Sequence, residues 1–219
     1  MKHSPPVKRA LEWRRSRKNS RLSLFYRENR RAIERGTVPE RYLRVVSQVT
    51  GPRVLEMGAA EGTLSLLLAS RGRVVVGVEP KADRAALAVR RTMTAPPLTG
   101  RLSFVFGDIR DHLPLLKNVD TFVGMRCIYY LRHDIERVFG AIAKHVPEVV
   151  LTGNAEREAK FVAGERSSLG DYERYATLEG MISLVVKKGY RVIHSEAGIP
   201  EERDPMVVAR LNTASSADE

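Results

Sequence analysis

The chain has 219 residues, 43% of them hydrophobic, and a formal net charge of +11, which is enough apolar content for one core-forming domain. Its single cysteine, Cys127, excludes an intramolecular disulfide. No apolar run reaches the roughly 18 residues of a membrane span, and the start, Met1–Pro6, lacks the apolar stretch of a secretory signal. We therefore expect a cytoplasmic protein.

The positive charge is concentrated at the N-terminus. Residues 1–35 contain twelve basic and three acidic residues, which is +9 of the total +11. The pattern predicts two helices, at about Val7–Lys18 and Leu22–Arg35. We expect a basic helical arm over residues 1–39 that attracts a polyanion, either RNA or an anionic membrane surface. The alternative is a solvated extension that aids solubility.

The first strand of the predicted domain runs into a helix through a glycine turn. A short buried strand at Val54 and Leu55 is followed by a turn at Gly58 and Gly62 and by an apolar helix from about Thr63. The backbone N–H groups of such a turn, and a helix N-terminus, hold a carboxylate or a phosphate.

A second apolar strand, Val74–Val78, ends at Glu79. An acidic side chain at that point accepts hydrogen bonds from a ribose diol, so the two strands together indicate an adenosine-containing cofactor. A nicotinamide dinucleotide is disfavoured, because its fingerprint requires three glycines where this chain has Gly58, Ala60 and Thr63.

Five further apolar runs follow along the chain. They lie at Leu102–Phe106, Thr121–Met125, Glu148–Thr152, Tyr190–His194 and Met206–Leu211. The first of them is followed by Gly107, Asp108 and Ile109, which again places an acidic residue directly after a strand.

The spacing of Glu56, Gly58 and Gly62, with Glu79 and Asp108 following in order, resembles motif I and its neighbours in the class I S-adenosylmethionine-dependent methyltransferases. The resemblance covers roughly residues 40 to 211. It implies an α/β, Rossmann-like fold, in which a mostly parallel seven-stranded sheet carries helices on both faces and ends in a hairpin. The chain departs from the family pattern at residue 60, where many members have glycine.

A finer likeness concerns the substrate. The phrase Val-Glu-Pro at residues 78–80, after an opening Leu-Glu-x-Gly-Ala at residues 55–59, is similar to the branch that methylates hydroxyls on sugars and polyketides.

The resemblance implies S-adenosylmethionine as the cofactor and gives each motif residue a role. Glu56 would face the ammonium group, Gly58 would let the backbone approach the methionine end, and Glu79 would bind the ribose. Asp108 would accept from the adenine amino group, and the N–H of Ile109 would meet a ring nitrogen. The predicted cofactor-binding set is Glu56, Gly58, Ala59, Gly62, Glu79, Asp108 and Ile109.

Methyl transfer takes place beyond the carboxyl ends of the strands in such a sheet. The candidate catalytic residues are Arg126, Tyr130 and His133. A hydroxyl acceptor must lose a proton, and histidine has an unperturbed pKa near neutrality; Tyr130 aligns with a position where the family often has histidine. Arg126 would meet an anionic acceptor. The alternatives are a surface His133 beside Asp134, and a salt bridge from Arg126 to Asp134 or Glu136.

The polar run Asn154–Tyr175 precedes a predicted helix at Thr177–Lys188. A loop of that length is uncommon unless it covers a site, so we read it as a substrate lid. No histidine has a partner at metal-ligand spacing, and no metal is expected. The candidate acceptor-binding residues are Arg126, Tyr129, Asn154, Arg166 and Tyr172.

The sequence thus predicts an arm (1–39), a methyltransferase domain (40–211) and a flexible tail (212–219). The favoured activity is O-methylation of a glycan or other small-molecule acceptor, with anionic and lipid-linked acceptors included. One alternative is RNA methylation with the arm as a clamp. The other is a non-catalytic protein that uses the same fold for binding.

Overall fold

The computed structural model describes residues 37–165 and 167–212. The predicted helices of the arm, the predicted tail from residue 213 on and the candidate residue Arg166 lie outside the described residues. The chain divides into two units between Leu43 and Arg44, and the sheet belongs to the second unit. The domain boundaries at 39/40 and 211/212 remain predictions. Within the described residues, no helix has both the length and the apolar content needed to cross a bilayer.

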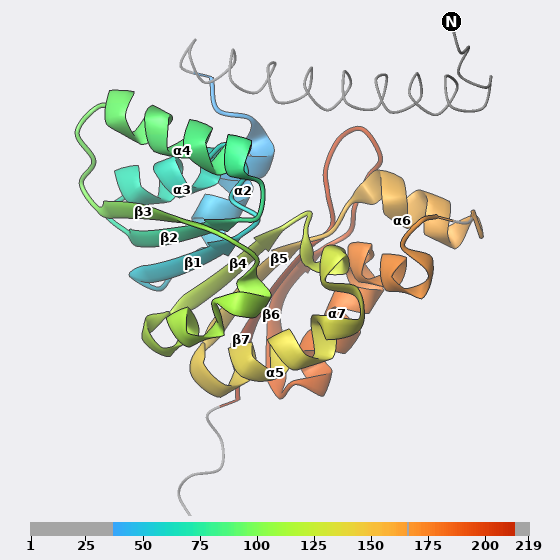
Figure 1. Cartoon of the computed structure of the whole chain (residues 1–219). Coiled ribbons are helices and arrows are strands. Elements are labelled where there is room, and N and C mark those ends of the chain that lie inside the picture. Colours follow the sequence, from blue (N-terminus) through green and yellow to red (C-terminus); the bar gives the residue numbers. More distant parts are fainter. Residues whose placement is uncertain (1–36, 166, 213–219) are drawn as a thin grey trace, which may run out of the picture. The chain divides into compact units, whose positions relative to one another are not determined.

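One seven-stranded sheet organises the second unit, with the strand order β3-β2-β1-β4-β5-β7-β6 (Figure 1). Strands β1 to β5 run parallel, whereas β7 is antiparallel to both β5 and β6. Each strand that the sequence predicts is present, and the mostly parallel sheet with a terminal hairpin is confirmed. The strands are β1 (Arg53–Met57), β2 (Val74–Glu79), β3 (Arg101–Phe106), β4 (Thr121–Met125), β5 (Glu148–Thr152), β6 (Tyr190–Glu196) and β7 (Met206–Leu211).

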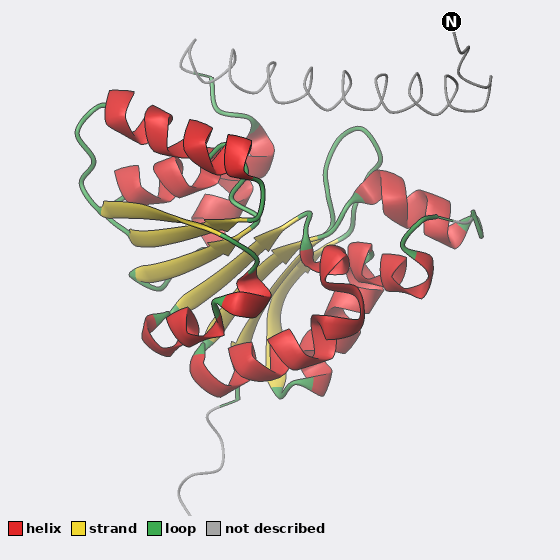
Figure 2. Ribbon diagram, viewed as in Figure 1, coloured by secondary structure: helices red, strands yellow, loops and turns green. Residues whose placement is uncertain are grey.

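Helices connect the strands and cover the sheet. Figure 1 shows α3 (Thr63–Ser70) and α4 (Ala82–Thr94) on one face, and α5 (Ile135–His145) and α7 (Leu178–Lys187) on the other. Figure 2 shows the same helix, sheet and helix layers by secondary structure. The remaining helices are α2 (Glu40–Gln48), α6 (Ala155–Val162) and the 3₁₀ helices η1 (Ile109–Asp111), η2 (Leu113–Asn118), η3 (Ile128–Asp134) and η4 (Gly170–Ala176).

The largest apolar cluster lies between the sheet and the helices α5 and α7. Phe122 of β4 and Phe139 of α5 are fully buried there, with their ring centroids 6.1 Å apart in an edge-to-face arrangement. Every residue of β5 is buried, since helices cover both faces of this central strand. This explains the apolar runs of the central strands β1, β4 and β5, whereas the edge strand β3 has no fully buried residue.

The prediction of a long loop over Asn154–Tyr175 is wrong. The first part forms α6, and residues 170–176 form η4. Alanine, glutamate, lysine and arginine dominate α6 and favour a helix, and the Asn154 side chain caps it by accepting the Arg157 N–H at 3.1 Å. The helix predicted at Thr177–Lys188 is confirmed as α7, with Thr177 as its cap.

A buried carboxylate ties together the amino ends of the central strands. Glu148 is 4% exposed and accepts hydrogen bonds from the Thr50 backbone (3.0 Å), the Thr50 and Thr121 hydroxyls (2.6 and 2.8 Å) and the Arg210 guanidinium (3.2 Å). Burial acts to raise the pKa of Glu148, but the hydrogen bonds from Thr50, Thr121 and Arg210 outweigh it and hold the pKa below its ordinary value.

The substitution Glu148→Gln should lower the free energy of unfolding at pH 7 by about 1–3 kcal/mol, because it removes a charge that all these donors favour. A lowered pKa means that the stabilising contribution of Glu148 is lost as the pH falls through its value in the folded protein. The difference between wild type and variant should therefore shrink in acid, which urea titrations at pH 7 and pH 3 would measure. Glu136→Gln, which alters a carboxylate that is 39% exposed, is the control and should change stability by only a few tenths of a kcal/mol, roughly. An equal loss for Glu148→Gln at both pH values would contradict this account.

Candidate functional site

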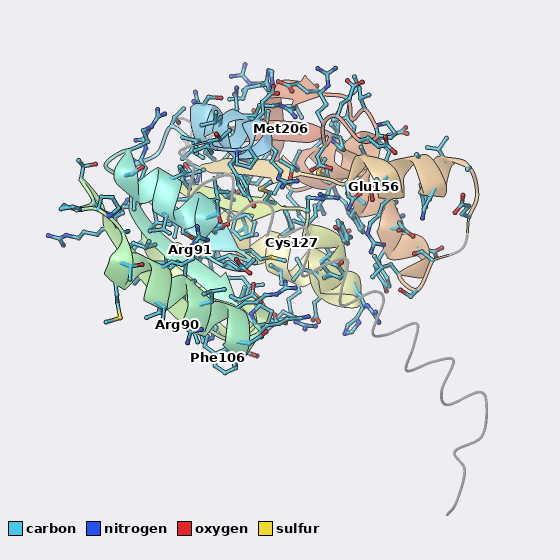
Figure 3. All side chains as sticks on the ribbon, turned by 90° about the horizontal axis from the view of Figure 1, so that it is seen from above. Arg90, Arg91, Phe106, Cys127, Glu156 and Met206 are labelled. Carbon is cyan, nitrogen blue, oxygen red and sulfur yellow. The ribbon has the colours of Figure 1, made fainter. Side chains whose placement is uncertain are left out.

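The strand order reverses between β1 and β4, which are adjacent in the sheet although two strands separate them in sequence. The loops after these two strands leave toward opposite faces, and ligands of open α/β sheets bind in the crevice that this creates. Figure 3 looks onto the molecule from above and shows Cys127, which follows β4, near the middle, between Arg91 of α4 and Glu156 of α6. The cofactor candidates and the acceptor candidates Arg126, Tyr129 and Asn154 lie at or soon after the carboxyl ends of the strands β1 to β5.

The turn after β1 contains three residues in the left-handed region. Their φ angles are 73° at Gly58, 50° at Ala60 and 74° at Gly62. A Cβ on Gly58 would lie 3.2 Å from the Cβ of Cys127, so glycine is needed both for the backbone angle and for the close approach of β1 to the segment after β4. Ala60 adopts the left-handed conformation despite its Cβ.

Glu79 holds this turn against the end of β2. Its two carboxylate oxygens accept the N–H groups of Ala60 (2.8 Å) and Lys81 (3.0 Å), and the side chain is 3% exposed. The N–H groups of Gly58 and Ala59 bond to the carbonyl of Val78 at 2.8 and 3.1 Å. Each carboxylate oxygen can still accept a further hydrogen bond, which suits the role predicted for Glu79 toward a diol.

Glu56 is buried at the carboxyl half of β1, with 3% of its surface exposed. Its carboxylate accepts a hydrogen bond from the hydroxyl of Ser65 in α3. Burial raises the pKa of Glu56 to about 7, since the Ser65 hydrogen bond offsets only part of the cost and the nearby Glu79 charge adds to it. Ser65 is a residue that sequence reasoning missed.

The carboxylate of Asp108, after β3, forms a salt bridge with a neighbouring arginine. Arg110 contacts both of its carboxylate oxygens, at 2.8 and 2.7 Å, and also donates to Asp134 at 3.0 Å. The hydrogen bonds from the Arg110 side chain hold the pKa of Asp108 below its ordinary value. Asp108 also caps η1 by accepting the Arg110 N–H, and Ile109 of η1 is 3% exposed. The loop after β3 is thereby linked to the end of η3.

Arg126 forms a salt bridge that the sequence did not predict. Its Nε lies 3.5 Å from the Oδ2 of Asp204, which is just before β7. The predicted alternative partners pair elsewhere: Asp134 with Arg110, and Glu136 with the two lysines at the end of α7, Lys187 and Lys188. The backbone of Arg126 is left-handed (φ 54°), and its N–H bonds to the Thr152 carbonyl at 3.0 Å. Because β7 runs antiparallel to β5, its first residues reach the same edge of the sheet as the candidate site.

Two tyrosines and an arginine form a cluster that follows Arg126 in the segments after β4 and β5. The guanidinium of Arg157 lies 5.2 Å from the ring centroid of Tyr129 and 5.9 Å from that of Tyr130, and it pairs with the buried Glu173 at 2.7 Å. Tyr129 is buried, and this burial raises the pKa of its phenol. Tyr130 is 53% exposed and offers its ring to solvent. The segments after β4, after β5 and in η4 are joined here.

The other candidates lie apart from this cluster or within the core. The His133 side chain is 76% exposed and lies 3.3 Å from Asp134, as the surface alternative describes. Tyr172 packs against the main apolar cluster. Cys127 is buried, which raises the pKa of its thiol, and its Sγ lies 3.1 Å from the Met57 carbonyl. In the described part of the chain no group of three His, Cys, Asp or Glu side chains could hold a metal ion.

Comparisons with known proteins agree with this geometry. A family model described as a methyltransferase domain matches residues 54–148, which run from β1 to the start of β5. The chain is 33% identical over 121 residues to a magnesium-protoporphyrin O-methyltransferase of Rhodobacter capsulatus, which covers 55% of this chain and 52% of that relative. It is 28% identical over 168 residues to an uncharacterised methyltransferase of Geobacillus kaustophilus, with 69% and 74% covered. The chain thus spans about half the length of the first relative.

Solved structures show the same fold. The magnesium protoporphyrin IX methyltransferase of Synechocystis PCC 6803, determined with bound S-adenosylmethionine, superposes with a TM-score of 0.55 at 14% identity and covers 78% of this chain and 76% of that one.

The left-handed turn is open to a direct stability test. Gly58→Ala should lower the free energy of unfolding by about 1–2 kcal/mol from backbone strain, and by more where the new Cβ crowds Cys127. Ala60→Gly is the matched control, because it removes a Cβ from a residue already in that conformation, and it should leave stability unchanged or improved. Thermal unfolding of both variants measures the contrast. Equal losses in the two would show that the turn geometry is misassigned.

Proposed function

Because the chain belongs to the class I S-adenosylmethionine-dependent methyltransferases, we propose that it transfers a methyl group from S-adenosylmethionine to an oxygen atom of a small-molecule or glycan acceptor. The observation that carries the proposal is the Gly58–Gly62 turn, held by Glu79 at the point where the strand order reverses. The methyltransferase match spans these same strands.

The residues around the turn fit the cofactor. Glu79 is fixed by two backbone N–H groups and keeps acceptor capacity for the ribose hydroxyls. Glu56 is a buried acidic group on the methionine side, and Gly58 leaves the backbone bare where the ligand approaches. Ile109 and Asp108 would meet the adenine. When bound, S-adenosylmethionine supplies a methyl group on a positively charged sulfur, and the protein's task is to align it with the acceptor.

The acceptor side is formed by the segments after β4 and β5. Tyr130 presents a half-exposed ring on which a sugar or a planar acceptor can stack. Arg126 and Arg157 are each paired with an acid, Asp204 and Glu173, so their charges already have partners. This balance favours a polar, hydroxyl-bearing acceptor over a strongly anionic one. Transfer to a hydroxyl also removes a proton, for which His133 and Tyr130 remain the predicted groups.

A second candidate function is RNA methylation. It rests on the twelve basic residues among the first 35, which would give affinity for a polyanion. Incubation of the full chain with radiolabelled S-adenosylmethionine and separate pools of glycosides, magnesium protoporphyrin and RNA would distinguish the two. We expect label in a small-molecule pool, at a rate insensitive to salt. Label confined to the RNA, with binding that falls steeply as salt rises, would favour the second candidate.

The cofactor assignment predicts selective binding of S-adenosylhomocysteine, the reaction product, with NAD as the negative control. Glu79→Ala should weaken that binding about 10- to 100-fold, since it removes charge-assisted hydrogen bonds of about 1.5–3 kcal/mol. Asp83→Ala, in the first turn of α4, removes an acid nearby in sequence and should leave affinity unchanged. Calorimetric titration measures all three proteins. Unchanged affinity in Glu79→Ala would overturn the assignment of the ribose site.

A further inference from the structure

Glu56 is a buried carboxylate without a cationic partner. It is 3% exposed, and it accepts a hydrogen bond from the Ser65 hydroxyl, which is itself fully buried. In the described part of the chain no lysine or arginine forms an ion pair with it. Two other buried acids, Glu148 and Glu173, each meet an arginine, and a third, Glu79, is held by two backbone N–H groups. A charge in such a place is costly unless something neutralises it.

Every titratable group near Glu56 disfavours its negative charge or leaves it unsupported. Glu79, at the end of the neighbouring strand β2, is acidic and raises the pKa of Glu56 further. Cys127, on the other side, is a buried thiol whose pKa is raised, so it is uncharged and supplies no positive charge. Ser65 of α3 contributes only neutral hydrogen bonding, from its hydroxyl and its backbone. The resting protein therefore gains little from an ionised Glu56.

We infer that Glu56 carries a proton in the ligand-free protein at and below neutral pH, and that it releases this proton to solvent when the ammonium end of the cofactor binds. The inference rests on the proposed function. The O–H bond of the carboxylic acid breaks, its proton passes to the buffer, and the ligand's ammonium group keeps its own protons. Burial, which holds the pKa of Glu56 at about 7 without ligand, sets the range in which the coupling operates. Glu56 thereby selects for ligands that bring a positive charge.

The test is calorimetric titration of the full chain with S-adenosylhomocysteine at pH 6 and pH 8, each in two buffers of different ionisation enthalpy. The difference between buffers gives the number of protons released. We expect about 0.9 protons per bound ligand at pH 6 and about 0.1 at pH 8, with binding about tenfold weaker at pH 6.

Two controls test whether the released proton comes from Glu56. Methylthioadenosine keeps the adenosine but lacks the amino-acid end, so it should bind with no proton release and no such pH dependence. This control also separates Glu56 from His112, whose ring lies against Gly107 at the adenine side and would report equally with either ligand. The variant Glu56→Gln should bind S-adenosylhomocysteine more weakly, with the same affinity at pH 6 and pH 8.

The inference can also be tested without ligand, by measuring the thermal stability of the protein at two pH values. A raised pKa means that wild-type stability falls as the pH rises from the ordinary value of 4.5 toward 7. Glu56→Gln should therefore melt at a higher temperature than wild type at pH 8, and at about the same temperature at pH 5.

The outcomes separate the two claims. Binding of S-adenosylhomocysteine at both pH values with no proton release would overturn the inference and leave the proposed function standing. Equal proton release with methylthioadenosine would also overturn it, by placing the titrating group at the adenosine half. No binding at either pH would contradict the proposed function itself, and with it the inference.

Discussion

The hydrogen bond from the Ala60 N–H to the Glu79 carboxylate is the contact on which the donor side of the site depends. It fixes the turn after β1 to the end of β2, so that the left-handed residues Gly58 and Gly62 keep their conformation without side-chain support. Together with the Lys81 N–H, it fixes the carboxylate of Glu79 at the end of β2. One contact therefore positions both the backbone that approaches the ligand and the acid that would bind its ribose.

The two halves of the site treat charge differently. On the proposed acceptor side, Arg126 meets Asp204 and Arg157 meets Glu173, and these ion pairs join different segments of the chain. On the proposed donor side, Glu56 is buried, and no lysine or arginine among the described residues forms an ion pair with it. Paired charges suit a wall that holds its shape around a polar acceptor. An unpaired buried acid is costly in the resting protein and becomes useful when a positively charged ligand arrives.

Most of the fold could be predicted from the sequence, because a strand buried on both faces is a local signal. Val74–Val78 is apolar apart from one glycine, Glu148–Thr152 has an apolar centre, and acids at strand ends, such as Glu79, mark the edge of the sheet. The helix α6 was missed, since a charged surface helix and a polar loop have similar composition.

The side-chain contacts of the site residues were harder to predict from the sequence than the places of these residues along the chain. Arg126 was placed correctly after β4, but its contact with Asp204 depends on β7 running back beside β5 in a particular register. Ser65 gave no signal in sequence, because a serine inside an apolar helix is common and only the fold brings it to Glu56. Arg157 lies within the polar run Asn154–Tyr175, and its position over Tyr129 and Tyr130 depends on the helix α6, which the sequence did not predict.

The central claim is that an adenosine cofactor binds at the carboxyl edge of β1, β2 and β3. Hydrogen–deuterium exchange of the full chain, with and without S-adenosylhomocysteine, tests the location directly. The account predicts slower exchange in residues 58–62 and 107–110, with no change at the opposite edge of the sheet, around Glu148. Protection at that opposite edge, or none in residues 58–62, would contradict it.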